Sequence, residues 1–309
     1  MRSYKTNSFL AKSPCVVALG CFDGVHIGHK AVIDEAVRIA RSKSANSVVW
    51  TFREPPKNFF FPNSSPIITE YEEKHKLIQS LGVDVFVSVP FDLKIGGLYP
   101  IEFFEKILLE KLKAVHIVCG YNYAFGKNGN GNTELLKKLC SEHNIGFTEI
   151  PIVTIDGVAV SSSQIRREIQ AGNVEIAAKY LDRPFALCTT VIDGHKLARQ
   201  LGFPTINQAF SEGRLVPKNG VYLTGVSFDS KKYFGITNVG TRPTVDGKQL
   251  FAETHIFDFS GDLYGKRVQI EFLHFMREET TFKSVDELAD RVRLDIHNAS
   301  QLVKQFCGI

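Results

Sequence analysis

The first half of the chain alternates short apolar runs with stretches of helical periodicity. Each run is short enough to be a buried strand, and each helical stretch is long enough to cross back over a sheet. This alternation is typical of a parallel sheet covered by helices on both faces, and it predicts an α/β Rossmann-like domain. Ligands of such sheets gather at the carboxyl ends of the strands. The predicted strands are 15–20, 47–52, 83–89, 115–120 and 146–150, and the predicted helices are 28–42, 70–81, 100–113 and 132–143.

The second half has a different pattern, in which strands dominate. Residues 161–180 predict two short helices, the first capped by a serine of the run at 161–163. Beyond residue 185, turns rich in Gly, Asp and Asn separate the apolar stretches, which indicates a sandwich or a small antiparallel β-barrel. An amphipathic helix is predicted at the C-terminus, over 284–305. We place the domain boundary between residues 182 and 183, giving domains 1–182 and 183–309. The predicted strands of the second domain are 186–192, 220–228, 233–239, 253–259 and 267–275.

Composition and charge narrow the class of protein. With 309 residues and 44% hydrophobic content, the chain is large enough for two domains with their own cores. Its net charge of +4 comes from basic residues interspersed with acidic ones, which argues against a nucleic-acid partner. No run approaches the ~20 apolar residues of a membrane helix, the N-terminal segment lacks the apolar centre of a signal peptide, and the six cysteines form no CxxC pair. We therefore expect a cytoplasmic protein with no membrane partner.

The stretch GCFDGVHIGHK, residues 20–30, joins the first predicted strand to the first predicted helix. Glycines at such a turn let backbone N–H groups approach a phosphate, and the helix N-terminus favours negative charge. His26 and His29 lie about one helical turn apart and project to the same side, where each offers a hydrogen bond to a phosphoryl oxygen. A metal site needs further ligands, and the other histidines are dispersed. We favour a phosphate site, with a metal site and simple packing as alternatives.

The motif resembles the HxGH signature of the nucleotidylyltransferase superfamily. Its form GxFDGxHxGH is similar to that of the adenylyltransferase half of bacterial bifunctional riboflavin kinase/FAD synthetases. GYNYAFGKNGNG (120–131) resembles the family's Gly-rich nucleotide and flavin segment, and SSSQIR (161–166) resembles its SSTxIR segment. The resemblance covers essentially the whole chain and implies that His26 and His29 are catalytic. The residues that it assigns to nucleotide or flavin binding in this domain are Gly20, Phe22, Asp23, Gly24, Gly28, Asn122, Gly126, Ser162, Ser163 and Arg166.

The residue types suit these roles. The guanidinium of Arg166 matches phosphate oxygens bidentately, and the carboxamide of Asn122 offers hydrogen bonds to a ribityl, ribose or phosphate group. Serines at the start of a helix are also ordinary caps. For Tyr123 and Phe125, ring stacking on a ligand and packing in the core both remain open.

A second set of motifs resembles the riboflavin kinase half of the same family. LGFPTIN (201–207) is similar to the GFPTAN signature, which implies that Thr205 and Asn207 bind Mg²⁺ and the phosphates. Neutral oxygens suit a hard cation that keeps ATP and water as its other ligands. AETHIFDF (252–259) resembles the strand that carries the general base, here Glu253. Without the resemblance, these segments would be a turn and a solvated strand face. The resemblance also assigns Gly202, Pro204 and Arg277 to nucleotide or flavin binding.

The chain departs from the family pattern at two places. After the second predicted strand, where the family often has TFxPHP, this chain has TFREPP, so that Pro55 replaces a histidine and Arg53 an acidic or polar residue. Before the GFPT signature, Lys196 and Ala198 stand where the family's glycine-rich flap has small residues. The first departure bears on the rate of adenylyl transfer, and the second bears on the flap that would cover ATP.

The resemblance as a whole implies a bifunctional enzyme. One domain would phosphorylate riboflavin with MgATP to give FMN, and the other would transfer AMP from a second ATP to FMN, giving FAD and pyrophosphate. FMN and FAD would then be substrate and product rather than prosthetic groups. The alternatives are an enzyme that retains one activity, an adenylyltransferase for another phosphate ester, and a flavin- or nucleotide-binding regulator without turnover. A regulator needs neither a general base nor metal ligands.

Overall fold

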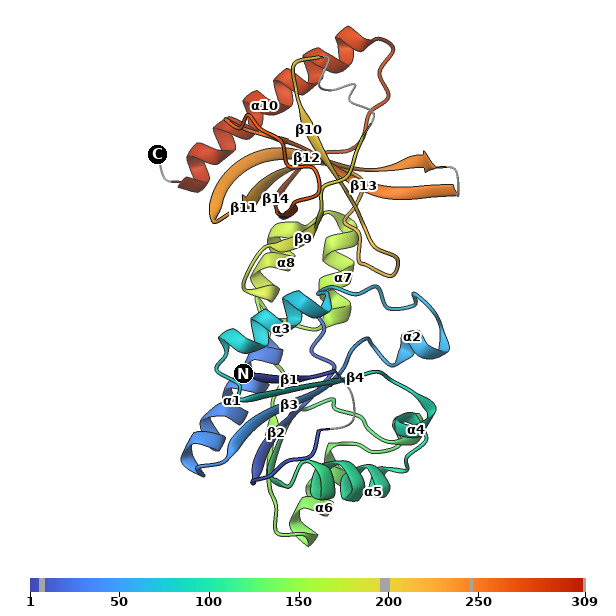
Figure 1. Ribbon diagram of the computed structural model, residues 1–309, viewed down its shortest axis with the longest axis vertical. Helices are drawn as coiled ribbons and strands as arrows, with labels where there is room; N and C mark the ends of the chain where they lie inside the picture. The colour runs from blue at the N-terminus through green and yellow to red at the C-terminus, as the bar shows by residue number, and fades with distance from the viewer. Residues whose placement is uncertain (6–8, 195–200, 245–246, 308–309) are drawn as a thin grey trace. The chain divides into compact units, whose positions relative to one another are not determined.

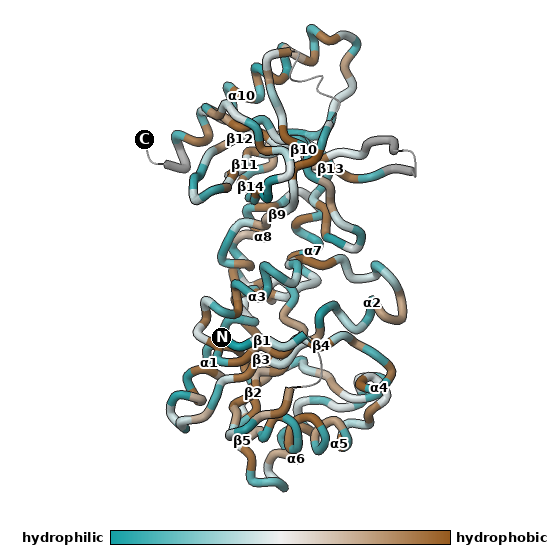
Figure 2. The backbone as a smooth tube through the Cα atoms, viewed as in Figure 1, coloured by the Kyte–Doolittle hydropathy of each residue, from teal (hydrophilic) through white to brown (hydrophobic). Residues whose placement is uncertain are grey.

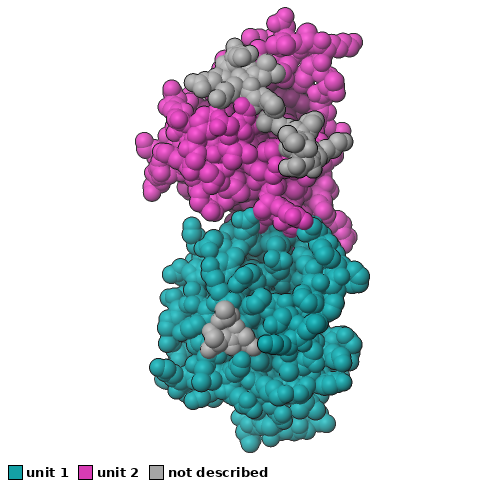
Figure 3. All heavy atoms as spheres, turned by 45° about the vertical axis from the view of Figure 1, so that its right-hand side comes forward, with its two compact units in different colours: residues 1–164 teal, residues 165–309 magenta. Residues whose placement is uncertain are grey.

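The computed structural model describes residues 1–5, 9–194, 201–244 and 247–307 (Figure 1). The departures at Lys196 and Ala198 therefore lie outside the described residues. The chain forms two compact units, residues 1–164 and residues 165–309, which Figure 3 distinguishes by colour. Among the helices that the structure describes, none is both long and apolar enough to span a bilayer.

The first unit is built on a six-stranded sheet in the order β1-β4-β3-β2-β5-β6, and all its neighbouring strands are parallel. Strand β2, which comes first along the chain among β2 to β6, lies between β3 and β5. The strand order therefore reverses at β2, and this switch point is where parallel sheets bind ligands. The strands are β1 (Arg2–Tyr4), β2 (Cys15–Leu19), β3 (Asn46–Phe52), β4 (Val85–Val89), β5 (Ala114–Gly120) and β6 (Gly146–Ile150).

Helices cover both faces of this sheet, as the sequence predicts. The longer elements are α1 (Ile27–Ser42), α3 (Tyr71–Ser80), α5 (Pro100–Phe103) with the π-helix η1 (Phe104–Lys111), and α6 (Thr133–Glu142). The segment predicted as one helix over 100–113 thus changes from an α-helical to a wider π-helical turn. The short elements are α2 (Lys57–Phe60), α4 (Leu93–Gly96), η2 (Lys127–Gly129) and the hairpin of β7 (Thr154–Ile155) and β8 (Val158–Ala159).

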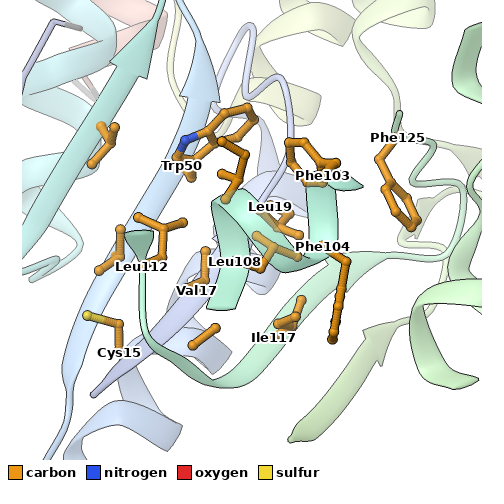
Figure 4. Packing of buried hydrophobic residues seen from close by; sticks show 14 of the residues in the cluster. Cys15, Val17, Leu19, Trp50, Phe103, Phe104, Leu108, Leu112, Ile117 and Phe125 are labelled. Carbon is orange, nitrogen blue, oxygen red and sulfur yellow. The ribbon is translucent and has the colours of Figure 1, made fainter. Parts of the chain in front are cut away.

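Two hydrophobic clusters separate the faces of the sheet. Val17 and Leu19 of β2 pack with Trp50, Phe103 and Leu108 on the face covered by α5, η1 and α6 (Figure 4). The alternate β2 residues join residues of α1 and α3 on the other face. Because both faces are buried, the central strands are apolar along most of their length, and they are brown in Figure 2.

The second unit contains α7 (Ser162–Ala171), most of which belongs to it, α8 (Val174–Leu181) and a six-stranded antiparallel sheet. The strand order is β10-β13-β12-β11-β14-β9, and an isolated bridge between Ile192 and Asn207 joins the two edges into a barrel. Helix α10 (Val285–Cys307) packs on one side of it. The strands are β9 (Phe185–Thr190), β10 (Thr205–Ala209), β11 (Gly220–Phe228), β12 (Lys231–Thr244), β13 (Gly247–Ile256) and β14 (Arg267–Arg277).

Three buried threonines connect neighbouring strands of this barrel. The Oγ1 atoms of Thr224 on β11 and Thr237 on β12 lie 2.8 Å apart, and the same distance separates those of Thr237 and Thr254 on β13. All three side chains are fully buried. The row of hydroxyls satisfies its own hydrogen bonds, so it is compatible with an otherwise apolar interior.

Candidate active sites

A cavity of about 720 Å³ lies in the first unit, beside the ends of β2, β3 and β5. Its wall includes the turn after β2, the segment after β3 and the glycine-rich segment after β5. The described lining residues contain no Asp or Glu, whereas they include His26, His29 and Lys57. An anionic ligand therefore meets donors and positive charge in this cavity without a facing carboxylate. The predicted site residues that line it are Gly20, Phe22, Gly28, Asn122, Gly126, Ser162 and Ser163, together with the two histidines.

The turn between β2 and α1 has an unusual backbone. Phe22, Gly24 and Val25 have φ angles of 49°, 90° and 40°, in the left-handed region that only glycine adopts without strain. The carboxylate of Asp23, which is 2% exposed, accepts hydrogen bonds from the N–H groups of Ile68 and Thr69 at 3.1 Å. Asp23 and Gly24 are not among the cavity-lining residues. The structure thus places Asp23 where it holds the strained turn in position.

His26 caps helix α1. Its Nδ1 accepts a hydrogen bond from the backbone N–H of His29 at 3.3 Å, so a neutral His26 ring carries its proton on Nε2. The two imidazole rings stack, with centroids 3.6 Å apart and planes inclined by 19°. A Cβ atom on Gly28 would lie 3.2 Å from Cε1 of His26, so the glycine makes room for the ring over the helix terminus. That terminus favours bound anions.

The segments after β5 and before α7 complete the wall. Gly126 has a φ of 73°, and a Cβ atom there would lie 2.8 Å from the backbone nitrogen of Pro100. Phe125 is 5% exposed and packs in the core against Phe103, while Tyr123 packs against the same cluster, so both rings are core residues that also line the cavity.

Two serines of the run at 161–163 make different hydrogen bonds, one at the start of helix α7 and one to the turn after β2. Ser161 Oγ accepts from the N–H of Gln164 at 3.2 Å, which confirms the predicted cap, and Ser162 Oγ donates to the carbonyl of Asp23 at 2.8 Å. Arg166 follows on α7, in the part of that helix that belongs to the second unit.

Sequence reasoning did not single out several residues of this cavity. Lys57 lies directly after Pro56 in the segment where the family pattern fails, and Phe60 and Phe91 also line the cavity. Phe59, Phe60 and Phe91 are in mutual edge-to-face contact. The run KNFFF at 57–61 was the available signal, because consecutive aromatic residues after a Pro-Pro pair are unusual for a solvated loop.

A second cavity, of about 240 Å³, lies in the second unit beside β13 and α10. It is lined by Thr205, Glu253 and Arg277 among the predicted site residues, and by apolar side chains that include Phe203 and Val292. Thr205 and Asn207 alternate on β10, and Asn207 pairs directly with Glu253 on β13, so the three side chains share one face of the sheet. The hydroxyl of Thr205 donates to Glu253 Oε1 at 2.8 Å.

Asn207 is 4% exposed and lies behind this wall. Its Oδ1 is buried, and within the described part of the chain no donor reaches it. A Cβ atom on Gly194 would lie 2.2 Å from Nδ2 of Asn207, so the backbone passes directly over the carboxamide. Gly202 and Pro204 flank the site without being lining residues, and the carbonyl of Pro204 lies 2.9 Å from Nδ1 of His255.

Arg277 is held by α10. Its Nε and Nη2 contact the carboxylate of Asp295 at 3.0 and 2.6 Å, and its Nη1 donates to the carbonyl of Glu278 at 2.9 Å. Arg291 approaches the same carboxylate at 3.2 Å, so a nearly buried Asp295 lies between two guanidinium groups. The orientation of Arg277 at the cavity wall is therefore fixed before any ligand binds.

The fold and the two cavities define a class of protein. It joins a nucleotide-binding α/β transferase unit to a β-barrel unit in which a glutamate carboxylate accepts a hydrogen bond from a threonine hydroxyl. The FAD synthetase family matches residues 9–164, and the riboflavin kinase family matches residues 181–303. The chain is 36% identical to the bifunctional riboflavin kinase/FMN adenylyltransferase of Pseudomonas fluorescens, with 93% of each chain covered. It is 33% identical to the enzyme of the same description from Bacillus subtilis (strain 168), with 92% of this chain and 91% of the relative covered.

A solved structure supports the fold of both units. A crystal structure of a protein from Streptococcus pneumoniae described as a macrolide-efflux protein has a TM-score of 0.88 and 31% identity, covering 96% of this chain and 98% of that one. The chain belongs to the bifunctional riboflavin kinase/FMN adenylyltransferase family, whose two activities make FMN and FAD.

Proposed function

We propose that the cavity of the first unit transfers AMP from ATP to FMN, and that the cavity of the second unit phosphorylates riboflavin. We assign the two activities to residues 1–182 and 183–309. The observation that carries the proposal is the contrast between the cavities. The first presents two stacked histidines and a helix N-terminus with no carboxylate among its described lining residues, whereas the second places a glutamate beside a hydroxyl.

The adenylyl transfer needs charge neutralisation more than a base. The phosphate of FMN is already an anionic nucleophile, and its oxygen attacks the α-phosphorus of ATP while the bond to pyrophosphate breaks. His26, with its proton on Nε2, and His29 stabilise the charge that builds on the phosphoryl oxygens. Gly20, Phe22 and Gly28 let the backbone approach the phosphates.

The remaining residues of the first site have supporting roles. We assign Asn122, Gly126 and Ser163 to the nucleotide and flavin, and Arg166 to the triphosphate. Asp23, Gly24 and Ser162 act by fixing the turn, since Asp23 accepts two backbone N–H groups and Ser162 binds its carbonyl.

The kinase step needs a base because its nucleophile is an alcohol. Glu253 takes the proton from the 5′-hydroxyl of the ribityl chain as the oxygen attacks the γ-phosphorus and ADP leaves. Thr205 fixes one oxygen of this carboxylate. Arg277 borders the flavin, and Gly202 and Pro204 shape the segment that leads into β10.

The residues present fit a magnesium ion carried by ATP. Asn207 Oδ1 is a buried oxygen with no donor among the described residues, and Thr205 Oγ1, whose O–H donates a hydrogen bond to Glu253, keeps lone pairs for a cation. Thr205 and Asn207 would hold the ion, which would supply positive charge to the transferring phosphates.

We also place the protein in the cytoplasm, because its described cysteines form no disulfide and free thiols suit a reducing compartment.

One experiment tests both assignments. Purified protein is incubated with riboflavin and MgATP, and riboflavin, FMN and FAD are then separated by chromatography. Sequential appearance of FMN and FAD is the expected result. Accumulation of FMN alone would show that the first cavity is inactive, and Pro55 in place of the family's histidine would then account for the loss. Flavin binding without any product would identify a regulator.

A further inference from the structure

Lys74 is a buried lysine on α3, and neither the motifs nor the proposed chemistry account for it. It is 1% exposed and is among the largest fully buried side chains of the described chain. No carboxylate pairs with it among the residues that the structure describes. Its Nζ instead contacts three backbone carbonyls, those of Cys21 at 3.3 Å, Phe52 at 3.4 Å and Arg53 at 3.5 Å.

This placement is energetically unfavourable for a lysine. An ammonium group that leaves water loses several kcal/mol of solvation, and three long hydrogen bonds to neutral carbonyls restore only part of it. Lys74 also lies in the first turn of α3, where the helix dipole disfavours a cation. A purely structural requirement for filling this space would be met at lower cost by methionine.

The three carbonyls belong to two of the segments that form the wall of the first cavity, the one after β2 and the one at the end of β3. Cys21 follows β2 and Phe52 ends β3, and both line the cavity. Nζ of Lys74 therefore lies behind the wall, and the lining residues Cys21 and Phe52 stand between it and the space that a ligand would fill. Thr51, which is fully buried, donates its hydroxyl to the same carbonyl of Cys21 at 2.8 Å.

Two donors on the carbonyl of Cys21 fix the orientation of one peptide unit. The chain has no cis peptide among its described residues, so the N–H of Phe22 points away from Lys74 and Thr51. None of the described hydrogen bonds uses this N–H. Phe22 lines the cavity and has a φ of 49°, a conformation that persists only when its surroundings impose it.

We propose that Lys74 is a positioning residue for adenylyl transfer. Together with Thr51 it holds the peptide between Cys21 and Phe22 so that the N–H of Phe22 faces the phosphates of ATP. Its charge has no carboxylate partner, so it also stabilises the negative charge that develops on the other side of the wall. This inference rests on the proposed assignment of adenylyl transfer to the first cavity.

The test compares four variants in the FMN-to-FAD assay: Lys74→Met, Thr51→Val, their combination, and Lys76→Met as the matched control. Lys76 is an exposed lysine on the same helix. We expect Lys74→Met to lower kcat on the order of 10²-fold with little change in the KM for FMN, because a displaced donor acts on the transition state. Riboflavin phosphorylation and the Lys76→Met variant should be unaffected.

The double variant separates positioning from general stability. Since Lys74 and Thr51 act on one carbonyl, the combined loss in kcat should fall short of the product of the single losses by about threefold or more. Multiplicative losses would overturn the proposal, as would a Lys74→Met enzyme that melts earlier but turns over within twofold of wild type. If Lys74→Met does not fold, Thr51→Val alone decides, because an unchanged kcat there contradicts the positioning role.

The His29→Ala variant tests the assignment of adenylyl transfer to the first cavity separately from the positioning role of Lys74. A His29→Ala enzyme that still makes FAD at the wild-type rate would refute the assignment of the cavity. Loss of FAD formation in His29→Ala but not in Lys74→Met would refute the positioning role of Lys74 and leave the assignment of the cavity intact.

Discussion

The hydroxyl of Thr205 donates a hydrogen bond to Glu253 Oε1 across 2.8 Å, between the paired strands β10 and β13. This bond joins the two family motifs of the second unit, GFPTIN and AETHIFDF, at one point. A carboxylate anchored in this way is held in a single orientation, which general-base catalysis requires.

Replacing Glu253 with glutamine should separate the two activities. The amide oxygen still accepts from Thr205, but the basic group is lost, so FMN formation should fall by about 10²–10⁴-fold. Conversion of supplied FMN to FAD should continue at the wild-type rate. Glu271→Gln, on β14 and outside the residues that line the cavity, is the matched control. Near-normal FMN production by Glu253→Gln would show that this carboxylate is structural.

His29→Ala should have the opposite selectivity. It removes an imidazole that stacks on His26 at the helix terminus, and FMN adenylylation should drop by ~10²-fold or more. Riboflavin phosphorylation, measured on the same preparation, should remain nearly unchanged. Equal loss of both activities would contradict the assignment of the reactions to two cavities.

Gly28→Ala should reduce activity without reducing stability. Alanine restricts the unfolded chain more than glycine does and stabilises compatible positions by about 0.4–1 kcal/mol, yet its Cβ would lie 3.2 Å from the ring of His26 and push the imidazole aside. We expect FMN adenylylation to fall by about 10-fold while the melting temperature stays the same or rises. A lower melting temperature with unchanged activity would show that the glycine serves the backbone instead.

Chelator-washed protein should contain no stoichiometric zinc and no tightly held magnesium. In the described part of the chain, no group of three or more His, Cys, Asp or Glu residues could hold a metal ion, and Thr205 and Asn207 offer only neutral oxygens. Added Mg²⁺ with ATP should restore both activities. Elemental analysis checks this, and zinc bound in a 1:1 ratio would overturn the phosphate interpretation of His26 and His29.

Asp84 should make stability of the first unit depend on pH. Burial alone would raise the pKa of this carboxyl, but hydrogen bonds from the N–H and hydroxyl of Ser47, with the ion pair to Arg41, outweigh it and lower the pKa. The stabilisation is therefore complete above the ordinary aspartate pKa and is lost as pH falls through the lowered one. Asp84→Asn should cost roughly 1–2 kcal/mol near neutral pH, and the difference from wild type should shrink as the pH falls below the ordinary aspartate pKa and through the lowered one. A difference independent of pH would contradict the ionic origin.

The predictability of the fold follows from burial. Strands β2 to β6 were predicted to within two residues. Strands β2 to β5 are apolar along most of their length because both of their faces are largely buried, whereas the edge strand β6 is only partly buried. β10 carries the polar sequence TINQA directly after a glycine and a proline, so its strand conformation depends on pairing with the distant β13. β1 has three residues, too few for any period.

The site was predictable where the signal is local. The turn at 20–30 and the alternation of Thr205 and Asn207 lie within single segments, and the structure brings His26 and Asn122 to one cavity. Lys74 could not be found in this way, because EEKHK looks like a solvated helix face and its contacts lie more than twenty residues away. The anchoring role of Asp23 depends equally on a remote backbone segment.

The row of buried threonine hydroxyls in the barrel determines more than local packing. Thr254 follows Glu253 directly, so the two side chains point to opposite faces of β13. A slip of β13 by one residue would turn Thr254 out of the row and bring the carboxylate of Glu253 into the apolar interior. Such a misaligned strand loses a hydrogen bond and buries an uncompensated charge, each of which is unfavourable by itself. A chain that aligns these three hydroxyls therefore also places the carboxylate of Glu253 on the face of the sheet that carries Thr205 and Asn207.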